Sequence, residues 1–226
     1  MNNPTYIAKN GEKKELMRAS PGGGCLIYGD VDRHNRKMKV ILGMRDPSVG
    51  EGLGLTFSGY YEVLKFYNHF KGSKGAIQSG LAEVYREGKE EVPGIWDIID
   101  IEYFADNAEP CLSAMIIGDD INPVHVGSSL LLYLEGDKRK ELLSTGPSPE
   151  QLGLIECILT WSKDIKRFMS GYISGVGTCW KTAGEEIAKM LKIEGTDEEF
   201  FHQHDIRVLA ELVWRAENER LWTKRI

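Results

Sequence analysis

The sequence has little cysteine, no long apolar run and no excess of basic residues. Its four cysteines form no Cys-x-x-Cys pair; they are Cys25, Cys111, Cys157 and Cys179. Zinc sites and redox motifs use that spacing, so we expect reduced, buried cysteines that pack as small apolar side chains. The longest apolar stretch, around Leu130–Leu134, is far too short to span a bilayer.

The charge balance excludes one class of function and permits another. The 28 Lys and Arg residues are outnumbered by 34 Asp and Glu, which gives a net charge of -6. This balance argues against a protein that sequesters nucleic acid on a basic surface. It permits an enzyme for small phosphorylated substrates, because a bound metal ion can supply the local positive charge. The first 15 residues have no apolar core typical of a signal peptide, so we expect a cytoplasmic protein with no membrane partner.

Alternating and periodic apolar residues predict a mixed α/β or α+β sandwich, in which a mixed sheet lies between helices. Strands are predicted over residues 25–28, 39–42, 55–57, 112–117, 127–134 and 154–161. Helices are predicted over residues 76–92, 162–169 and 178–191, and a last one opens at a capping box over residues 196–199. Residues 1–21 form a polar, irregular lead-in, and residues 62–75 give no assignment.

The segment from Glu83 to Glu91 carries the main chemical signal. On a helix, Glu83, Glu87 and Glu90 share one face and Glu91 lies at its boundary. Carboxylates on one face repel each other unless a cation lies between them, and Mg²⁺ prefers such oxygen ligands. A solvated acidic helix face is the alternative interpretation, and on this segment alone it stays open. Gly88 lies on the apolar side, where it allows a close approach to the sheet.

The pattern Arg86-Glu87-x-x-Glu90-Glu91 followed by Gly94 resembles the core of the Nudix hydrolase signature. Three further segments resemble the pieces of that family in the same order. These are 39–45 (a strand that ends in arginine), 55–62 (a strand that leads into Ser58-Gly59) and 155–161 (a later strand that ends in tryptophan). The resemblance covers residues 22–170 and predicts a Nudix-like domain there, after the lead-in and before a C-terminal helical extension over residues 171–226.

The box, over residues 58–94, is degenerate in three respects. Residues 63–75 look like an insertion, and Gln78 stands where the family has a glutamate. The final glycine, Gly94, comes one residue late, after Pro93. We therefore expect that another carboxylate replaces the missing one, for which Glu62 and Glu83 are candidates, or that the site holds fewer metal ions.

The resemblance implies roles for named residues. Mg²⁺, or alternatively Mn²⁺, would be held by Glu87, Glu90 and Glu91, with the carbonyl of Gly59 at the edge of the site. Glu87 would also act as the base that polarises the attacking water, and Arg86 would orient it. The expected substrate-binding residues are Arg45, Tyr60 and Tyr61, with Phe66 and Tyr67 as further aromatic candidates that a core would equally well use.

Members of this family often recruit one more carboxylate from a later loop. The candidates are Asp119, Asp120, Glu135 and Glu156. The segment 118–123 has strong turn chemistry, so we favour a plain turn over a ligand role for the two aspartates.

Three functions remain as hypotheses. The leading one is Mg²⁺-dependent hydrolysis of the pyrophosphate in a nucleoside diphosphate derivative such as ADP-ribose, a dinucleotide or a nucleotide sugar. The second is a catalytically weak module that senses a nucleotide or contacts a protein. The third is action on RNA 5′ ends through a basic patch at Lys65, Lys71 and Lys74, without a stable nucleic-acid complex. A homodimer, or a lid built from the C-terminal helices, stays open.

Overall fold

The computed structural model describes residues 5–7, 13–15, 22–48, 51–60, 84–111, 115–116, 125–165, 189–198 and 203–218. Within this part of the chain, nine strands form one sheet whose main path runs β11-β10-β4-β3-β9-β7. Off this path, β5 pairs with β4, β6 with β3 and β8 with β9. The strands are β3 (Gly22–Asp32), β4 (Lys37–Arg45), β5 (Leu53–Gly54), β6 (Phe57–Tyr60), β7 (Glu109–Pro110), β8 (Met115–Ile116), β9 (His125–Tyr133), β10 (Gln151–Trp161) and β11 (Leu191–Glu194).

The sheet is mixed, as predicted. Strands β3 and β9 run parallel, with Gly22 opposite Gly127 and Tyr28 opposite Tyr133, while the other pairs are antiparallel. The long antiparallel pair β4–β10 ends near Arg45, which lies opposite Gln151. The predicted strands over 25–28, 39–42, 127–134 and 154–161 correspond to β3, β4, β9 and β10, and residues 55–57 overlap the start of β6.

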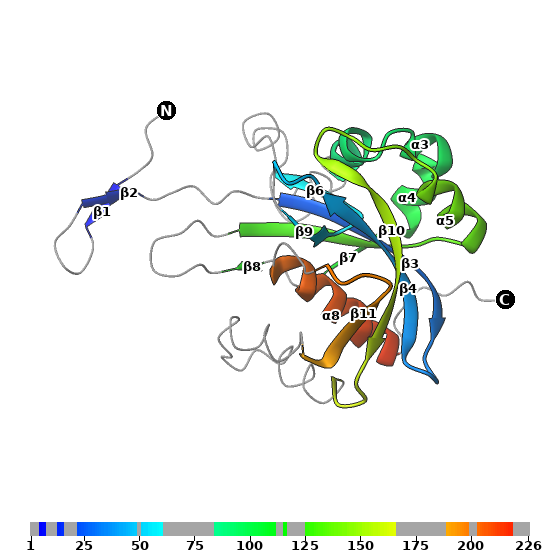
Figure 1. Cartoon of the computed structure of the whole chain (residues 1–226). Helices are drawn as coiled ribbons and strands as arrows, with labels where there is room; N and C mark the ends of the chain where they lie inside the picture. Colours follow the sequence, from blue (N-terminus) through cyan, green and yellow to red (C-terminus); the bar gives the residue numbers. More distant parts are fainter. Residues whose placement is uncertain are drawn as a thin grey trace.

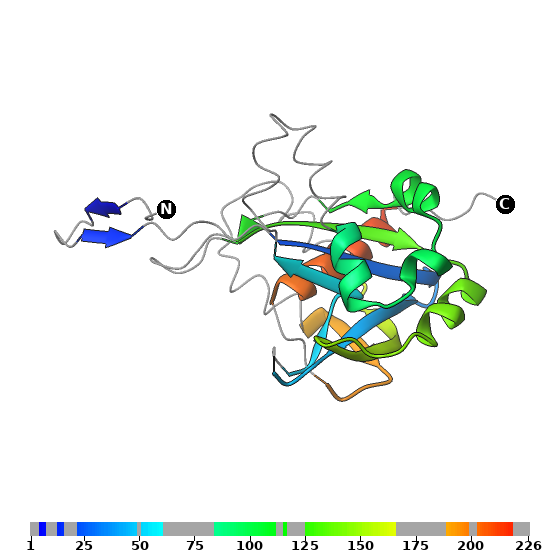
Figure 2. The ribbon, with the colours of Figure 1, turned by 90° about the horizontal axis from the view of Figure 1, so that it is seen from above.

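Helices cover both faces of the sheet, which gives a mixed α+β fold. One face packs on α8 (Gln203–Glu217), whose buried residues include Leu209, Leu212 and Val213. The other face packs on the helix over residues 84–91 and on α3 (Ile95–Ile98), α4 (Ile101–Asn107) and α5 (Gly136–Leu143). Figure 1 shows α8 on one side of the strands and α3, α4 and α5 on the other, and Figure 2 shows the same layers from above.

The alternation of side chains along β3 explains why both faces need cover. Leu26 and Tyr28 belong to the core beneath α8, whereas Cys25 and Ile27 belong to the core on the opposite face. Successive residues of a strand point to opposite faces, and each of these four is at most 1% exposed. A strand that is apolar at every position is therefore buried on both sides.

The structure corrects three predictions of secondary structure. Residues 1–21 are not wholly irregular, because β1 (Thr5–Ile7) and β2 (Lys13–Glu15) pair as a separate two-stranded antiparallel sheet. The C-terminal segment is not wholly helical, because β11 adds a strand beside β10. The short helices α3, α4 and α5 were not predicted at all. In addition, no described helix combines the length and the apolar character that a bilayer span requires.

The elements β11 and α8 both come from the segment 171–226, which we expected to be a helical extension. β11 pairs with β10 from Ile158 to Trp161, and α8 buries its apolar face on the same core as β3 and β4. These two elements therefore complete the sheet and core of the preceding segment. Their position also brings the first turn of α8 close to the end of β4.

Candidate functional site

The helix over residues 84–91, which we call the carboxylate helix, is held against the sheet by its apolar side. Val84 is fully buried, and Gly88 packs on Trp96 and Phe57. A Cβ added to Gly88 would lie 2.8 Å from Cζ2 of Trp96 and 3.1 Å from Cε2 of Phe57. Glycine costs about 1 kcal/mol in a helix interior, and here it allows the close approach that we predicted. The helix stops before Gly94, whose φ of 78° lies in the left-handed region.

Glu87 points from this helix onto the backbone of β6. Its side chain is buried, and a Cβ added to Gly59 would lie 2.2 Å from the Cδ atom of Glu87. A side chain at position 59 would therefore displace the Glu87 carboxylate. Gly59 thus marks a close approach of another group to the strand backbone, as glycine in a strand often does. It places the backbone of β6 and the Glu87 carboxylate in one small region.

Glu91 is the most deeply buried carboxylate of the helix, at 2% exposure. Its Oε1 accepts a hydrogen bond from Nη1 of Arg45 at 3.0 Å, and its Oε2 accepts one from the backbone N–H of Ser58 at 2.7 Å. Burial raises the pKa of Glu91, and the Arg45 charge and the Ser58 N–H offset part of that rise. The contacts tie the carboxylate helix to β4 and β6.

Arg86 bridges the other two carboxylates of the helix. Its Nη2 donates to Oε1 of Glu87, and its Nη1 donates to Oε2 of Glu90 four residues on. Glu90 is the solvent-facing member of the set, with 57% of its side chain exposed. The contact of Arg86 with Glu87 was expected from the sequence, and Arg86 pairs with Glu90 as well. Whether Arg86 orients a catalytic base stays a prediction.

Three glycines of the sheet lie directly beneath polar side chains of this region. They are Gly43 under Gln151, Gly54 under Arg45 and Gly59 under Glu87. A Cβ at any of the three would come within 2.9 Å of the side chain above it. Because side chains of β4, β5 and β6 are absent at these points, polar groups lie directly on the sheet beneath the carboxylate helix. Elsewhere on that face, apolar side chains fill the space.

Asp205, in the first turn of α8, is a buried acid on which charges of this site act, and sequence reasoning missed it. It is 3% exposed, and its Oδ2 atom has no hydrogen-bond partner among the described residues. Burial raises its pKa to about 7; the Arg45 charge lowers it and the Glu91 charge raises it. The Nε atom of Arg45 is likewise buried without a hydrogen-bond partner in the described part of the chain. An acid at the start of an amphipathic helix looks like ordinary helix chemistry, so the sequence held no signal for this residue.

The donor chemistry of the site fits Mg²⁺. Glu87, Glu90 and Glu91 lie within roughly 100° of arc on the helix, and all supply the hard oxygen atoms that this ion takes. Within the described ranges, however, no three acidic, histidine or cysteine side chains converge closely enough to hold a metal ion as they stand. The guanidinium groups of Arg86 and Arg45 provide the compensating positive charge in this arrangement.

Other predicted residues lie away from this region. Glu156 binds Arg139 at 3.0 Å and Lys39 at 3.1 Å, opposite Ile41 on β4. This is four residues along the strand from Arg45, roughly 13 Å away. Glu135 follows β9 beside the Tyr28 end of β3, five residues from the Gly23–Gly59 pair, roughly 17 Å. Neither residue is the additional carboxylate that we expected at the site.

Several predicted residues fall outside the described part of the chain. These are Tyr61, Glu62, Lys65, Phe66, Tyr67, Lys71, Lys74, Gln78, Glu83, Asp119 and Asp120, together with the side chain of Tyr60. Their roles stay predictions. Arg45, which we expected to bind substrate, is instead engaged with Glu91 and, at 2.5 Å from its Nη2, with the hydroxyl of Ser58.

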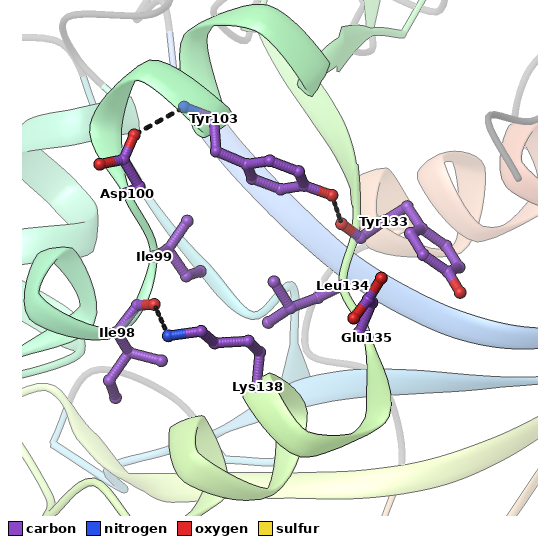
Figure 3. Close-up of a pocket in the computed structure, with 8 residues that line it drawn as sticks. All are labelled: Ile98, Ile99, Asp100, Tyr103, Tyr133, Leu134, Glu135 and Lys138. Atoms are coloured by element: carbon purple, nitrogen blue, oxygen red, sulfur yellow. Dashed lines mark hydrogen bonds between the residues drawn. The ribbon is translucent and has the colours of Figure 1, made fainter. Parts of the chain in front are cut away.

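A separate cavity of about 370 Å³ opens beside α3, α4 and α5. Its lining residues are Ile98, Ile99, Asp100, Tyr103, Tyr133, Leu134, Glu135 and Lys138 (Figure 3). The hydroxyl of Tyr103 donates to the carbonyl of Tyr133, and Nζ of Lys138 donates to the carbonyl of Ile98, both at 2.9 Å. The first bond joins α4 to β9 and the second joins α5 to α3, so the cavity offers no cluster of reactive groups comparable to that at the carboxylate helix.

Comparison with known proteins adds little. No protein-family model matches the sequence, and no curated protein matches it. Among solved structures, the chain is similar to the crystal structure of DR0079 from Deinococcus radiodurans, with 12% sequence identity and a TM-score of 0.38. The similarity covers 94% of this chain and 97% of that chain. A likeness of this strength supports no particular family or function, which leaves the residues of the site to carry the proposal.

Proposed function

We propose that this chain is a Nudix-like hydrolase that cleaves the pyrophosphate of a nucleoside diphosphate derivative with the help of Mg²⁺. The observation that carries the proposal is the burial of Glu87 and Glu91, four residues apart on one helix, against Gly59 and the Ser58 N–H. Burying charged carboxylates is costly unless they are paired. A solvated acidic face would not place two of its carboxylates beneath the surface, so this geometry disfavours the simplest alternative.

The degenerate Arg-Glu-x-x-Glu-Glu pattern and the mixed sheet between helices support the same proposal. In it, Glu87, Glu90 and Glu91 hold Mg²⁺, with Mn²⁺ as a substitute, and the Gly59 carbonyl lies at the edge of the site. The ion supplies charge neutralisation of the diphosphate and a lowered pKa for water. Arg86 restrains Glu87, which takes the proton of the attacking water.

The proposed classes of substrate follow from the phosphate chemistry rather than from a pocket. ADP-ribose, dinucleotides and nucleotide sugars share a diphosphate between two organic groups, and the same site serves all three. A nucleotide base would stack on Tyr60 or Tyr61 under this proposal. Residues 63–75 and the C-terminal segment would set the choice among these substrates.

One observation favours the second hypothesis, a module that binds a nucleotide or a protein and catalyses weakly. Arg86 and Arg45 together already pair with all three carboxylates. In such a module these arginines would be permanent partners, and the cation would be dispensable. For action on RNA 5′ ends, the three lysines that suggested it lie outside the described residues, and nothing in the site favours it.

The test is hydrolysis of a nucleotide panel in Mg²⁺ by the native chain and by Glu90→Gln. Glu90 is exposed, so its substitution leaves the buried contacts in place. We expect a loss of hydrolysis of at least 100-fold, on the scale of an electrostatic group at the reacting centre. The matched control is Glu102→Gln on α4, an exposed carboxylate outside the site, which should hydrolyse the panel at the native rate.

No turnover by the folded native chain, with Mn²⁺ also tried, would contradict hydrolysis and favour the binding module. Equal turnover by the native chain and Glu90→Gln would keep an enzyme but remove the carboxylate helix from its chemistry. Competition of small nucleotides by capped RNA would separate the RNA hypothesis from the leading one.

A further inference from the structure

Each carboxylate of the proposed cation site already has an arginine partner within the chain. Arg45 pairs with Glu91, and Arg86 bridges Glu87 and Glu90. A cation that binds these carboxylates therefore meets positive charge that is already in place. The burial of the two arginines indicates which of their contacts a cation can displace.

Arg45 is firmly held on its carboxylate. Its side chain is 11% exposed and that of Glu91 is 2% exposed, and Arg45 also donates to the hydroxyl of Ser58. Separating a buried ion pair leaves uncompensated buried charges, which is strongly destabilising. Each oxygen of an ionised carboxylate has two lone pairs, so Glu91 can take a cation and keep Arg45. The Arg45–Glu91 contact is therefore the one that persists.

The contact between Arg86 and Glu90 has the opposite character. The Arg86 side chain is 29% exposed and that of Glu90 is 57% exposed, so both groups can be hydrated when they separate. Exposed pairs of this kind, four residues apart on a helix, are weak. The other partner of Arg86 is Glu87, whose side chain is 6% exposed and lies against Gly59. Arg86 can thus release Glu90 at small cost while it keeps the buried Glu87 paired.

We propose that the Arg86–Glu90 contact is exchangeable, and that a divalent cation displaces Arg86 from Glu90 when it binds the carboxylate helix. The inference rests on the proposed function, in which Glu90 is a ligand for Mg²⁺. A cation on Glu90 beside the guanidinium places two positive charges on one carboxylate, and like charges repel at that distance. Arg86 then remains on Glu87, as the proposed role of Glu87 requires. Arg86 is therefore an internal competitor of the cation as well as the partner of Glu87.

A role for Arg86 that is purely orienting predicts the opposite sign. Residues that only hold metal ligands in place raise the affinity for the metal, so their removal weakens binding. Under the exchange, removal of Arg86 strengthens cation binding and still lowers hydrolysis, because Glu87 loses its partner. The sign of the change in affinity, measured without substrate, separates the two roles.

The first measurement is Mn²⁺ binding by electron paramagnetic resonance without substrate, on the native chain and on Arg86→Gln. We expect about fivefold tighter binding by Arg86→Gln, because the share of molecules with an unoccupied Glu90 rises. The matched control is Lys89→Gln, which removes one exposed positive charge from the same helix, about 100° around the helix from Glu90. Lys89→Gln should tighten binding by less than about twofold. Equal tightening in both variants, or unchanged or weaker binding by Arg86→Gln, would overturn the proposal.

The second measurement assigns the effect to Glu90. Arg86→Gln is combined with Glu90→Gln, and the Mn²⁺ affinity of the double variant is compared with that of Glu90→Gln alone. We expect the fivefold gain to shrink to less than about twofold, the non-additivity of two groups in one contact. A gain that stays fivefold would mean that Arg86 acts through its charge on the whole site, and the exchange at Glu90 would be wrong. Arg86→Lys, which keeps the charge but lacks the fork that bridges two carboxylates, replaces Arg86→Gln if the latter does not fold, with the same expected sign.

The outcomes distinguish the failure of this inference from the failure of the proposed function. Tighter Mn²⁺ binding by Arg86→Gln, together with no hydrolysis by the native chain, would support the exchange and contradict the proposed function. Hydrolysis that depends on Glu90, together with weaker Mn²⁺ binding by Arg86→Gln, would support the proposed function and overturn the exchange. Binding of Mn²⁺ by neither chain would contradict both.

Discussion

Arg139 and Arg45 both lie beside carboxylates, at opposite ends of the sheet, and they differ in how completely their donors are paired. Arg139 is 1% exposed, and all its donor groups are used: Nε binds Glu156, Nη1 binds the carbonyl of Leu134, and Nη2 binds Asp30. Arg45 leaves its Nε unpaired. Both lie directly on a glycine, Gly29 and Gly54 respectively.

This difference distinguishes an arginine with a purely structural role, Arg139, from one that the proposed function also uses, Arg45. A buried arginine whose donors are all satisfied fixes one arrangement of the chain. Arg45 keeps one buried donor unpaired among the described residues, so its arrangement is less completely fixed. Under the proposed function, the carboxylate-helix site is where a ligand would change the pairing, whereas the Arg139 cluster is a fixed part of the scaffold.

The largest expected effect concerns Asp205 and pH, measured in EDTA. The folded chain keeps a proton on Asp205 up to a pH of about 7, whereas the unfolded chain loses it near pH 3.8. The folded state thus binds more protons in this window, so the free energy of unfolding falls as pH rises from 4 to 7. We expect at most about 4 kcal/mol of this fall to disappear in Asp205→Asn.

Chemical denaturation at a series of pH values provides the measurement. A difference between native and Asp205→Asn that is constant from pH 4 to 7 would show that Asp205 is not a buried protonated group. Glu91 is buried with a raised pKa too, and it is common to both proteins, so the comparison isolates Asp205.

The next prediction concerns the cluster around Arg139. Arg139→Met removes a fully paired buried charge and should lower the free energy of unfolding by about 3 kcal/mol. Hydrolysis per folded molecule should stay at the native value, because the cluster lies at the far end of the sheet. Lys140→Met is the matched control on the same helix; Lys140 is 80% exposed in its side chain and should change stability by less than about 0.5 kcal/mol. Loss of turnover in folded Arg139→Met would break the distinction between the two arginines.

Two glycines, one at each end of the sheet, allow a third prediction with a matched pair of variants. Gly29→Ala places a Cβ 1.8 Å from Nη1 of Arg139, and Gly59→Ala places one 2.2 Å from Cδ of Glu87. Both variants should be less stable. Only Gly59→Ala should also lose turnover, on the order of 100-fold, because it displaces Glu87. Unfolding curves and rates per folded molecule measure the two effects, and native turnover in Gly59→Ala would remove Glu87 from the chemistry.

The smallest effect is expected at Ser58. Ser58→Ala removes the hydroxyl that accepts from Arg45 but keeps the backbone N–H that binds Glu91. The free energy of unfolding should fall by about 1 kcal/mol, the net value of one hydrogen bond. A loss of several kcal/mol would instead indicate that Ser58 fixes Arg45 in a single arrangement.

The local part of the site was predictable from sequence, because its residues are close along the chain. Glu87, Glu90 and Glu91 fall on one helix by periodicity alone, and Arg86 is within reach of two of them. The role of Gly59 followed from the resemblance of the strand that carries it. The burial of Asp205 was not predictable, since it depends on the packing of α8, from the far end of the sequence, on the sheet.

The fold, like the site, has parts that the local sequence predicts and parts that it does not. The strands β3, β4, β9 and β10 were predicted because each contains a short run of apolar residues. The helix α3 has four residues, too few for a periodic pattern, and α5 consists mainly of charged residues with one fully buried leucine, Leu142. The strand β11 has only four residues, and its first residue, Leu191, fell at the end of the helix predicted over residues 178–191. Tertiary packing, rather than local preference, decides such segments.

The central claim is that the carboxylate helix is a cation site, and its most direct test is Mn²⁺ binding followed by electron paramagnetic resonance, without substrate. The native chain and Glu87→Gln/Glu91→Gln are compared, with Glu102→Gln as the control. We predict that the native chain and the control bind Mn²⁺ in competition with Mg²⁺, and that the double variant, folded, binds at least 100-fold more weakly, since it loses two charged ligands. Equal Mn²⁺ binding by the native chain and the double variant, or no binding by the native chain, would contradict the claim.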